Sequence, residues 1–263
     1  MASRTSAFAL LLILCAVSAT ARVQTGFLDR TVSISGRSYR YQVYIPADFR
    51  SKKYWPVMLF LHGAGERGSD GLLQTDVGLP HAIRQNASRF PFVVVIPQCN
   101  QDKTWGEPEM RAQALAALDA SINEFHGDRN HIYLTGLSMG GFGTWEIAAA
   151  NPGRFAALVP ICSGVRPLKD WPELKVKVSD ASKAADPYAE VARRIGHTPV
   201  WMFHGDADQS VPVEESRHMA EALKAANAEF KYTEYPGVNH NSWDKAYAEP
   251  ELVPWLLAHK LPR

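Results

Sequence analysis

One serine lies in a sequence pattern that makes a hydroxyl group reactive. Ser138 is the centre of Gly136–Gly140, a GxSxG pattern that follows the apolar run Ile132–Leu134 and precedes a helical stretch through Trp145. A strand that turns sharply into a helix leaves little room beside the nucleophile, so glycines flank it and its side chain projects above the sheet edge. The N-terminus of the next helix also favours developing negative charge. We therefore expect Ser138 to be the nucleophile of an acyl-transfer reaction.

A serine hydroxyl needs a neighbouring base to take its proton. In proteins that carry this type of turn, the acid and then the histidine follow the serine along the chain. Three histidines come late enough, but His218 falls in a predicted helix and His259 lies four residues from the end. His240 instead follows a predicted strand, Phe230–Tyr235, in a turn rich in Gly and Asn. We expect His240 to be the base.

The acid that orients this histidine should lie in the loop after the preceding strand. The segment His204–Pro212 follows the apolar run Val200–Phe203 and contains two candidates, Asp206 and Asp208. The carboxylate must fix the imidazole tautomer and stabilise the imidazolium ion. Spacing alone does not choose between the two aspartates.

An acyl-transfer site also needs hydrogen-bond donors for the oxyanion of the tetrahedral intermediate. The segment His62–Gly68 follows the apolar run Val57–Leu61, and its small residues allow backbone N–H groups to approach a substrate oxygen. We expect the donors to be the N–H groups of Met139 and Ala64, with Gly65 as the alternative to Ala64.

Three other side chains of this loop have simpler interpretations. His62 precedes Ser138 in the chain, so we expect a structural histidine beneath the loop and not a base. Glu66 and Arg67 are expected to order the loop as an ion pair, and direct substrate contact is the alternative.

Two of the seven tryptophans fall on loops at the predicted active face. Trp105 and Trp243 are expected to form walls of an acyl pocket, and core packing is the alternative for both. No group of Cys, His or acidic residues has the spacing of a metal site, and no phosphate-binding GxxxxGK[ST] loop is present. We therefore expect neither a metal nor a cofactor.

These residues require a scaffold of alternating strands and helices. An alternating pattern around Ser35–Arg37 predicts an antiparallel hairpin over 26–46. Continuous apolar runs are typical of parallel strands that are buried on both faces, and they occur at Val57–Leu61, Phe92–Ile96, Ile132–Leu134, Ala157–Ile161 and Val200–Phe203. Helices are predicted between them, through Leu115, Leu118, Ile122 and Phe125 and over Glu214–Ala226. The order predicts a mostly parallel central sheet with helices on both faces.

Two features of this scaffold leave alternatives open. The polar segment Val165–Gly196 is either a cap over the site or a decorated crossover with one helix near Pro187–Arg194. Cys99 and Cys162 fall at the ends of strands that are not neighbours, so a disulfide and two buried thiols are both compatible with the sequence.

The beginning of the chain has the pattern of an export signal. Arg4 supplies a positive charge, Ala7–Val17 is a short apolar run, and Ala19–Ala21 is a small-residue cleavage site. We expect cleavage after Ala21, which leaves residues 22–263 as one catalytic domain that is secreted or periplasmic. A lipid anchor on Cys15 and an uncleaved anchor are the alternatives.

Composition narrows the range of partners. The 263 residues carry a formal net charge of +1, with acidic and basic residues interspersed. No broad electrostatic field therefore favours nucleic acid or an anionic membrane. We expect a small-molecule substrate, with no nucleic acid partner and no stable membrane association after signal cleavage.

Six motifs together resemble one bacterial branch of the α/β hydrolases. They are HGAGERGSD from His62, PQC from Pro97, GLSMGGFGTW from Gly136, PICSG from Pro160, HGDADQSVPV from His204 and YPGVNHNSWDKAY from Tyr235. The resemblance extends from about Val57 to Leu257 and implies the α/β-hydrolase fold. It also implies Asp208 as the acid of a triad with Ser138 and His240, which leaves Asp206 to organise the loop.

Members of this branch are described as carboxylesterases, phospholipase-like hydrolases or prolyl-oligopeptidase-like peptidases, so the resemblance does not fix a substrate. We expect a carboxylic ester hydrolase that works through an acyl-enzyme. The alternatives are a serine peptidase of prolyl-oligopeptidase type, for which 263 residues leave little room for a gating domain, and a (lyso)phospholipase-type acyl hydrolase. A catalytically inactive binding module is a third class, and Ser138, Asp208 and His240 argue against it.

Overall fold

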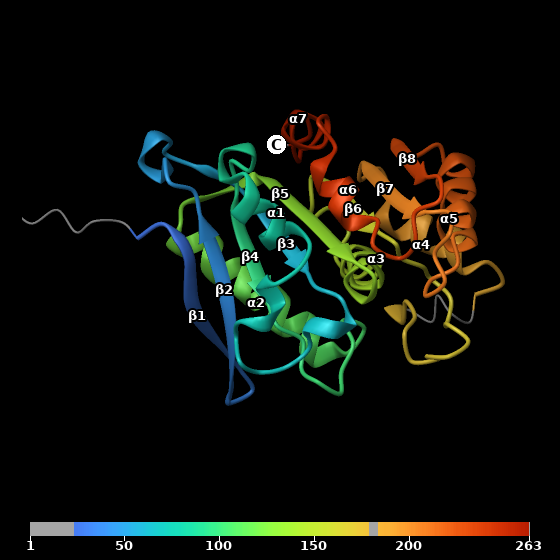
Figure 1. The fold of residues 1–263 in the computed structure, drawn as a ribbon, viewed down its shortest axis with the longest axis horizontal. Helices are drawn as coiled ribbons and strands as arrows, with labels where there is room; N and C mark the ends of the chain where they lie inside the picture. The colour runs from blue at the N-terminus through green and yellow to red at the C-terminus, as the bar shows by residue number, and fades with distance from the viewer. Residues whose placement is uncertain (1–23, 179–183, 263) are drawn as a thin grey trace, which may run out of the picture.

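The computed structural model describes residues 24–178 and 184–262 and contains one eight-stranded sheet (Figure 1). The strand order is β1-β2-β4-β3-β5-β6-β7-β8. β2 pairs antiparallel with β1 and β4, and all later pairs are parallel. The strands are β1 Gly26–Ile34, β2 Arg37–Ile45, β3 Trp55–Leu61, β4 Val93–Pro97, β5 Gly127–Leu137, β6 Ala157–Ile161, β7 Val200–Gly205 and β8 Phe230–Tyr235.

Helices cover both faces of the sheet. One face packs against α2 to α5, and the other packs against α1, α6 and α7. The helices are α1 Leu79–Gln85, α2 Pro108–Glu124, α3 Met139–Ala150, α4 Pro187–Ile195, α5 Glu214–Ala225, α6 Trp243–Ala248 and α7 Leu252–Ala258. This is the α/β-hydrolase fold that the sequence predicted, including the antiparallel hairpin at one edge.

The continuous apolar runs form strands because both of their faces are covered. In β3, Val57 and Leu59 point into the core layer beneath α2 and α3, whereas Met58 and Phe60 point into the layer beneath α1, α6 and α7. Successive side chains of a strand point to opposite faces, so a strand between two helical layers needs apolar residues at every position. This explains why the parallel strands could be identified from the sequence.

The hairpin turns at Ser35 and Gly36, whose φ angles are 49° and 79°. A two-residue hairpin loop with positive φ at both positions matches the right-handed twist of the strands it joins. The hairpin places Arg37–Arg40 at the edge of the sheet where β3, β4 and β5 end.

The described part of the crossover between β6 and β7 is anchored to α3. The buried carboxylate of Glu146 accepts hydrogen bonds from the N–H groups of Lys177 and Val178. Glu146 also forms an ion pair with Arg111 of α2. The one predicted helix of this crossover is α4, which packs against α3 and α5. Residues 179–183 of the crossover lie outside the described residues.

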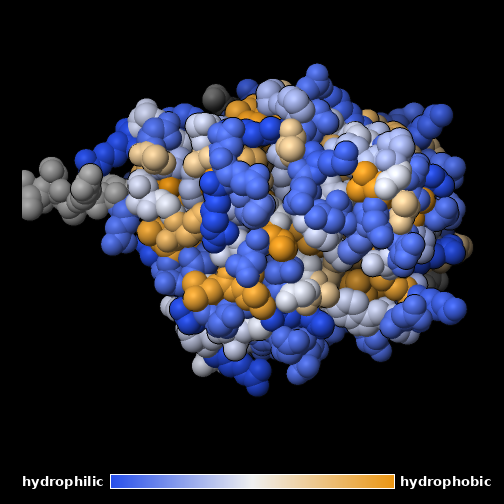
Figure 2. All heavy atoms as spheres, viewed as in Figure 1, coloured by the Kyte–Doolittle hydropathy of each residue, from blue (hydrophilic) through white to orange (hydrophobic). Residues whose placement is uncertain are grey.

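Two expectations about the surface and the thiols can be compared with this fold. Figure 2 shows that polar side chains dominate the visible face and that apolar areas on it are small and separated. None of the helices in the described ranges has the length and apolar character needed to cross a membrane.

Cys99 and Cys162 are buried free thiols. The expected signal segment 1–21 lies outside the described residues.

Candidate active site

Ser138 lies at the turn between β5 and α3, in a backbone conformation that is rare for a side-chain-bearing residue. Its φ and ψ angles are 52° and −121°. Its N–H donates to the Ile161 carbonyl at 2.9 Å, and its own carbonyl accepts from the N–H groups of Gly141 and Phe142. These bonds hold the strained turn in place, as expected where backbone strain occurs at a functional site.

The glycines around Ser138 are required by close backbone approach. A Cβ atom on Gly140 would lie 1.9 Å from the Leu61 carbonyl oxygen, and one on Gly136 would lie 2.3 Å from the Gly140 carbonyl oxygen. Both distances are far below van der Waals contact. Only glycine therefore allows β3, β5 and the start of α3 to approach so closely, which gives the GxSxG pattern its physical basis.

His240 lies beside Ser138 although the two residues are 102 positions apart. The loop after β8 places its Nε2 atom 2.9 Å from Ser138 Oγ. On the other side of the ring, Nδ1 lies 2.7 Å from Asp208 Oδ2. The structure thus brings the three predicted residues into one hydrogen-bonded series. An imidazole between a hydroxyl and a carboxylate can accept a proton from the hydroxyl through Nε2.

Asp208 is held in a dense set of donors. Its Oδ1 atom accepts from the N–H groups of Ser210 and Val211 at 2.8 and 3.0 Å. Its Oδ2 atom faces His240 and also His204, whose Nε2 lies 3.1 Å away. Burial alone would raise the pKa of the carboxyl group, but these hydrogen bonds outweigh burial and hold the pKa well below its usual range. Asp208 is therefore a carboxylate at neutral pH.

Asp206 has a different position two residues earlier. Its Oδ1 atom accepts from the N–H of Gly237 at 2.6 Å, and its backbone N–H donates to the Tyr235 carbonyl. These contacts join the loop after β7 to the loop that carries His240. Asp206 thus organises the loop and does not contact the imidazole, as the resemblance implied.

The loop after β3 approaches Ser138 from the other side. A Cβ atom on Gly63 would lie 3.7 Å from Ser138 Cβ, so the loop that bears Ala64 lies directly beside the serine. Met139 is the first residue of α3, where a backbone N–H has no acceptor within the helix. The two expected oxyanion donors, Ala64 and Met139, therefore lie on the two segments that flank Ser138.

His62 supports this loop from below. The N–H of Cys99 donates to its Nε2 atom at 2.9 Å, so Nδ1 carries the proton and donates to the Gly63 carbonyl at 2.6 Å. Burial lowers the pKa of His62 to about 4, which keeps the ring neutral. His62 is a structural histidine, as the sequence predicted.

Trp105 does not take the place that the sequence predicted. Its side chain is 0% exposed, packs edge-on against His62, and donates through Nε1 to the His62 carbonyl at 3.0 Å. A side chain without accessible surface cannot be a wall that a substrate touches. Trp105 is part of the core beneath the loop, because its indole N–H finds a buried acceptor there.

The expected ion pair in the loop is also absent. Arg67 donates through Nε to the Ala64 carbonyl at 2.9 Å, and its guanidinium lies over the ring of Trp171 from the crossover segment. Glu66 turns inward, where burial raises the pKa of its carboxyl group. Adjacent residues point in different directions here, so Glu66 and Arg67 do not pair, and the Glu66 Oε2 atom is buried without a hydrogen-bond partner.

Trp243 begins α6 three residues after His240. Its ring packs edge-on against the His240 imidazole, with ring centroids 5.5 Å apart, and it remains partly exposed. Trp243 therefore lies at the site, in contact with the imidazole that connects Ser138 with Asp208.

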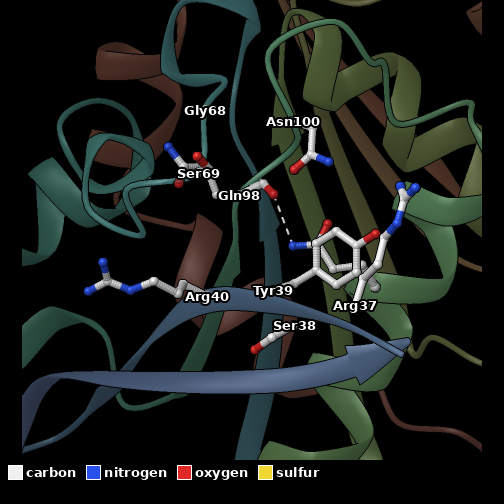
Figure 3. A pocket seen from close by; sticks show the side chains of 9 residues that line it. Arg37, Ser38, Tyr39, Arg40, Gly68, Ser69, Gln98 and Asn100 are labelled. Atoms are coloured by element: carbon white, nitrogen blue, oxygen red, sulfur yellow. Dashed lines mark hydrogen bonds between the residues drawn. The ribbon is translucent and has the colours of Figure 1, made fainter. Parts of the chain in front are cut away.

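A polar hollow of about 550 Å³ lies next to the loop after β3. Figure 3 shows Arg37, Ser38, Tyr39 and Arg40 of β2 on one side of it, and Gly68, Ser69, Gln98 and Asn100 on the facing loops. Gln98 ties these loops together through hydrogen bonds with the Gly71 N–H, the Glu66 carbonyl and Asp70. The hollow is therefore bounded on one side by the segment that continues from Ala64.

One cluster in the described residues combines side chains that can bind metals. The ligand atoms of Cys162, Asp208 and His240 lie within 4.8 Å of one another. Asp208 Oδ2 and His240 Nδ1 already face each other at hydrogen-bond distance, and burial raises the pKa of the Cys162 thiol. The Cys162 thiol is neutral, and the Asp208 carboxylate and the His240 imidazole are hydrogen-bonded to each other. The three side chains are therefore close because they pack around this hydrogen bond, and we assign no metal to them.

A comparison with known families agrees with this geometry. Residues 100–258 match the prolyl oligopeptidase family. The chain belongs to the prolyl oligopeptidase family. The matched stretch contains Ser138, Asp208 and His240, whereas the loop with Ala64 precedes it. The family and the α/β-hydrolase fold both agree with the arrangement of Ser138, His240 and Asp208.

Several proteins are similar to this family member over much of its length. It is 27% identical over 202 residues to an uncharacterized secreted protein of Arthroderma benhamiae, a match that covers 70% of this chain and 21% of that protein. It is 26% identical over 157 residues to esterase LipC of Mycobacterium tuberculosis, which covers 48% of this chain and 38% of that enzyme. The crystal structure of a thermostable esterase has a TM-score of 0.72 and 31% identity, and covers 89% of this chain and 63% of that one. The chain thus spans less than two thirds of each of these relatives.

Sequence reasoning gave no role to His204, which is the second imidazole on Asp208. Its signal was present, because it directly follows the apolar part of β7 in the motif that contains both aspartates. A polar residue at the end of a buried strand lies at the same sheet edge as the site.

Proposed function

We propose that this protein is a secreted carboxylic ester hydrolase, with Ser138 as nucleophile, His240 as base and Asp208 as orienting acid. The observation that carries this proposal is the contact of 2.9 Å between Ser138 Oγ and His240 Nε2, with Asp208 2.7 Å from the opposite ring nitrogen. Each atom has the partner that its role requires: a base for the hydroxyl and a carboxylate for the developing imidazolium.

In the first half of the reaction, Ser138 Oγ attacks the ester carbonyl while His240 Nε2 takes the hydroxyl proton. The carbonyl oxygen becomes an oxyanion, which the N–H groups of Ala64 and Met139 stabilise. His240 then donates its proton to the departing alcohol, and the C–O bond of the ester breaks. The product of this half is an acyl-enzyme on Ser138.

In the second half, a water molecule takes the place of the alcohol. His240 removes a proton from this water, which attacks the acyl carbonyl, and the same oxyanion donors stabilise the second intermediate. His240 returns the proton to Ser138 Oγ as the acid product leaves. Asp208 stays ionised throughout, which its low pKa favours. Trp243 supports the imidazole and forms one wall of the acyl pocket.

Similarity to esterases supports ester substrates over peptides. The thermostable esterase is 31% identical to this chain, and esterase LipC is 26% identical. The family that matches residues 100–258 is named after a peptidase, however, so a serine peptidase is the second candidate. A phospholipase-type acyl hydrolase would use the same residues on a longer acyl chain.

A paired assay separates these candidates. We expect p-nitrophenyl esters of short acyl groups to be hydrolysed at least about 100-fold faster, as kcat/KM, than p-nitroanilides of matched acyl groups. The reason is that an amide leaving group needs more help from a general acid than a phenolate does. The series should include peptide anilides and a lysophospholipid. Equal rates on amides and esters would contradict the proposal and favour the peptidase.

We propose that residues 1–21 are an export signal and that residues 22–263 form the catalytic domain. The secreted relative from Arthroderma benhamiae supports export, and the pattern of residues 4–21 supports cleavage after Ala21. N-terminal sequencing of the exported protein should begin at Arg22. A start at Met1 or at Cys15 would contradict this assignment.

A further inference from the structure

The carboxylate of Asp208 is shared by two histidines. His204, the fifth residue of β7, is 0% exposed, and its Nε2 atom lies 3.1 Å from Asp208 Oδ2 and 3.1 Å from the Val211 carbonyl oxygen. Both of these atoms are hydrogen-bond acceptors. Nε2 of His204 must therefore carry a proton and act as the donor.

The opposite nitrogen of His204 is also engaged. Its Nδ1 atom lies 2.7 Å from the hydroxyl oxygen of Ser216 in α5, and Ser216 is buried at 4% exposure. In the neutral imidazole, the Ser216 hydroxyl donates to Nδ1 and so fixes the tautomer with the proton on Nε2. Asp208 thus faces a second serine–histidine pair on its buried side, in which the two ring nitrogens have exchanged roles relative to His240.

We propose that His204 is a positioning residue for the reaction: its Nε2–H holds the Asp208 carboxylate in the orientation that His240 requires and limits how strongly Oδ2 attracts the His240 proton. This inference rests on the proposed function, because it concerns the same triad. It assigns no contact between His204 and the substrate.

The two oxygens of Asp208 explain why a second imidazole is needed. Oδ1 is fixed by the N–H groups of Ser210 and Val211. Oδ2 would otherwise have only the Nδ1–H of His240, whose ring gains and loses a proton at Nε2, and with it a positive charge, during each catalytic cycle. A second donor whose charge does not change during the cycle keeps Oδ2 in place while the charge of the His240 ring alternates. Each hydrogen bond to Oδ2 also spreads the negative charge of this oxygen. The His204 donor therefore lowers the basicity of the Oδ2 atom that faces His240.

Other polar groups face this pair and must be considered in any test. The Cys162 thiol lies close to Asp208 and His240, and Glu234 of β8 interacts electrostatically with His204. Oδ2 instead faces the Nε2 atom of His204 at 3.1 Å, and the Ser216 hydroxyl holds the other side of that ring. The substitutions below leave both of these groups unchanged.

The decisive variant is His204→Leu, which keeps an apolar body of similar size and removes the donor. We expect kcat for a p-nitrophenyl ester to fall by about 10- to 100-fold, with KM nearly unchanged, because small displacements of a catalytic group are costly. We also expect the acid side of the pH profile of kcat/KM to move to higher pH. The sign follows because a more basic Oδ2 stabilises the imidazolium form of His240. The neutral imidazole, which is the active base, then appears only at higher pH.

Two further variants separate positioning from simple destabilisation. His204→Gln can present an N–H near the position of Nε2 and should recover most of kcat and the original pH profile. Ser216→Ala keeps the imidazole but removes the group that fixes its tautomer, so it should change kcat and the profile in the same direction as His204→Leu, by less. Tyr133→Phe, which loses a partly buried hydrogen bond to the His259 carbonyl, is the control for lost stability and should leave both readouts unchanged.

The outcomes also distinguish this inference from the function on which it rests. A folded His204→Leu or Ser216→Ala protein with the wild-type kcat and pH profile would overturn the positioning role, even if Ser138→Ala is inactive. If Ser138→Ala keeps its activity, the triad itself is wrong. A low-field proton resonance from the hydrogen bond between His240 and Asp208 should shift in His204→Leu and return in His204→Gln.

Discussion

Replacing Ser138 by Ala should lower kcat for p-nitrophenyl esters by about 10⁵- to 10⁶-fold, the size of loss seen when a serine protease loses its nucleophile. Without the hydroxyl, no acyl-enzyme can form, and only the oxyanion donors and substrate binding continue to accelerate hydrolysis. The fold should survive, because alanine removes a single oxygen and keeps the backbone bonds from Ser138 to Ile161, Gly141 and Phe142. Steady-state kinetics and thermal melting of purified variants measure both effects.

Covalent labelling gives a readout that is independent of the substrate. A fluorophosphonate should add to the wild-type protein at Ser138, as located by mass spectrometry, and should not add to Ser138→Ala. Ser163→Ala is a suitable control, because Ser163 is a buried serine that accepts from Trp145 Nε1 and lies outside the proposed triad. Labelling of Ser138→Ala with more than about 1% of the wild-type rate would place the nucleophile at another residue.

The parallel part of the sheet could be predicted because the burial of a strand is visible in the residues of that strand alone. Strands β6 and β8 begin and end at the predicted residues, and the helix α5 ends within one residue of its predicted end. β6 is fully buried, which requires an apolar residue at each of its positions, so its signal in the sequence is continuous and independent of the partners. β8 is only partly buried and carries polar residues, so this reason does not apply to it. The role of Ser138 could also be predicted from the sequence. The close approach of residue 140 to Leu61 allows only glycine there, and this requirement is visible as the GxSxG pattern.

Side chains on loops were less predictable, because sequence periodicity does not specify where they point. Trp105 was expected at the substrate and lies in the core, since the carbonyl of His62 offers its indole a buried acceptor. Arg67 was expected to pair with its neighbour Glu66 and instead lies over Trp171, a residue more than one hundred positions later. In both cases the decisive partner comes from a distant segment of the chain.

Spacing along the chain also did not decide whether Asp206 or Asp208 is the acid, and replacing each aspartate tests the assignment. Asp208→Asn should lower kcat by up to about 10⁴-fold, as in serine proteases that lose the acid, with little change in substrate binding. Asp206→Asn is its matched control, with the same change of charge and shape two residues earlier. Asn at 206 keeps an oxygen for the Gly237 N–H, so we expect kcat within about tenfold of wild type and a stability loss of about 1 kcal/mol or less.

The contacts of Asp208 explain why the same change is so costly there. Two backbone N–H groups face Oδ1, and two imidazole nitrogens face Oδ2. An asparagine has only one oxygen, and if that oxygen faces the backbone donors, its NH₂ group faces the imidazoles. His240 can then only accept at Nδ1, which moves its proton to Nε2 and leaves no atom to take the proton of Ser138. If Asp206→Asn instead lost activity as severely as Ser138→Ala while Asp208→Asn stayed near wild type, the acid would be Asp206 and the proposed triad would be wrong.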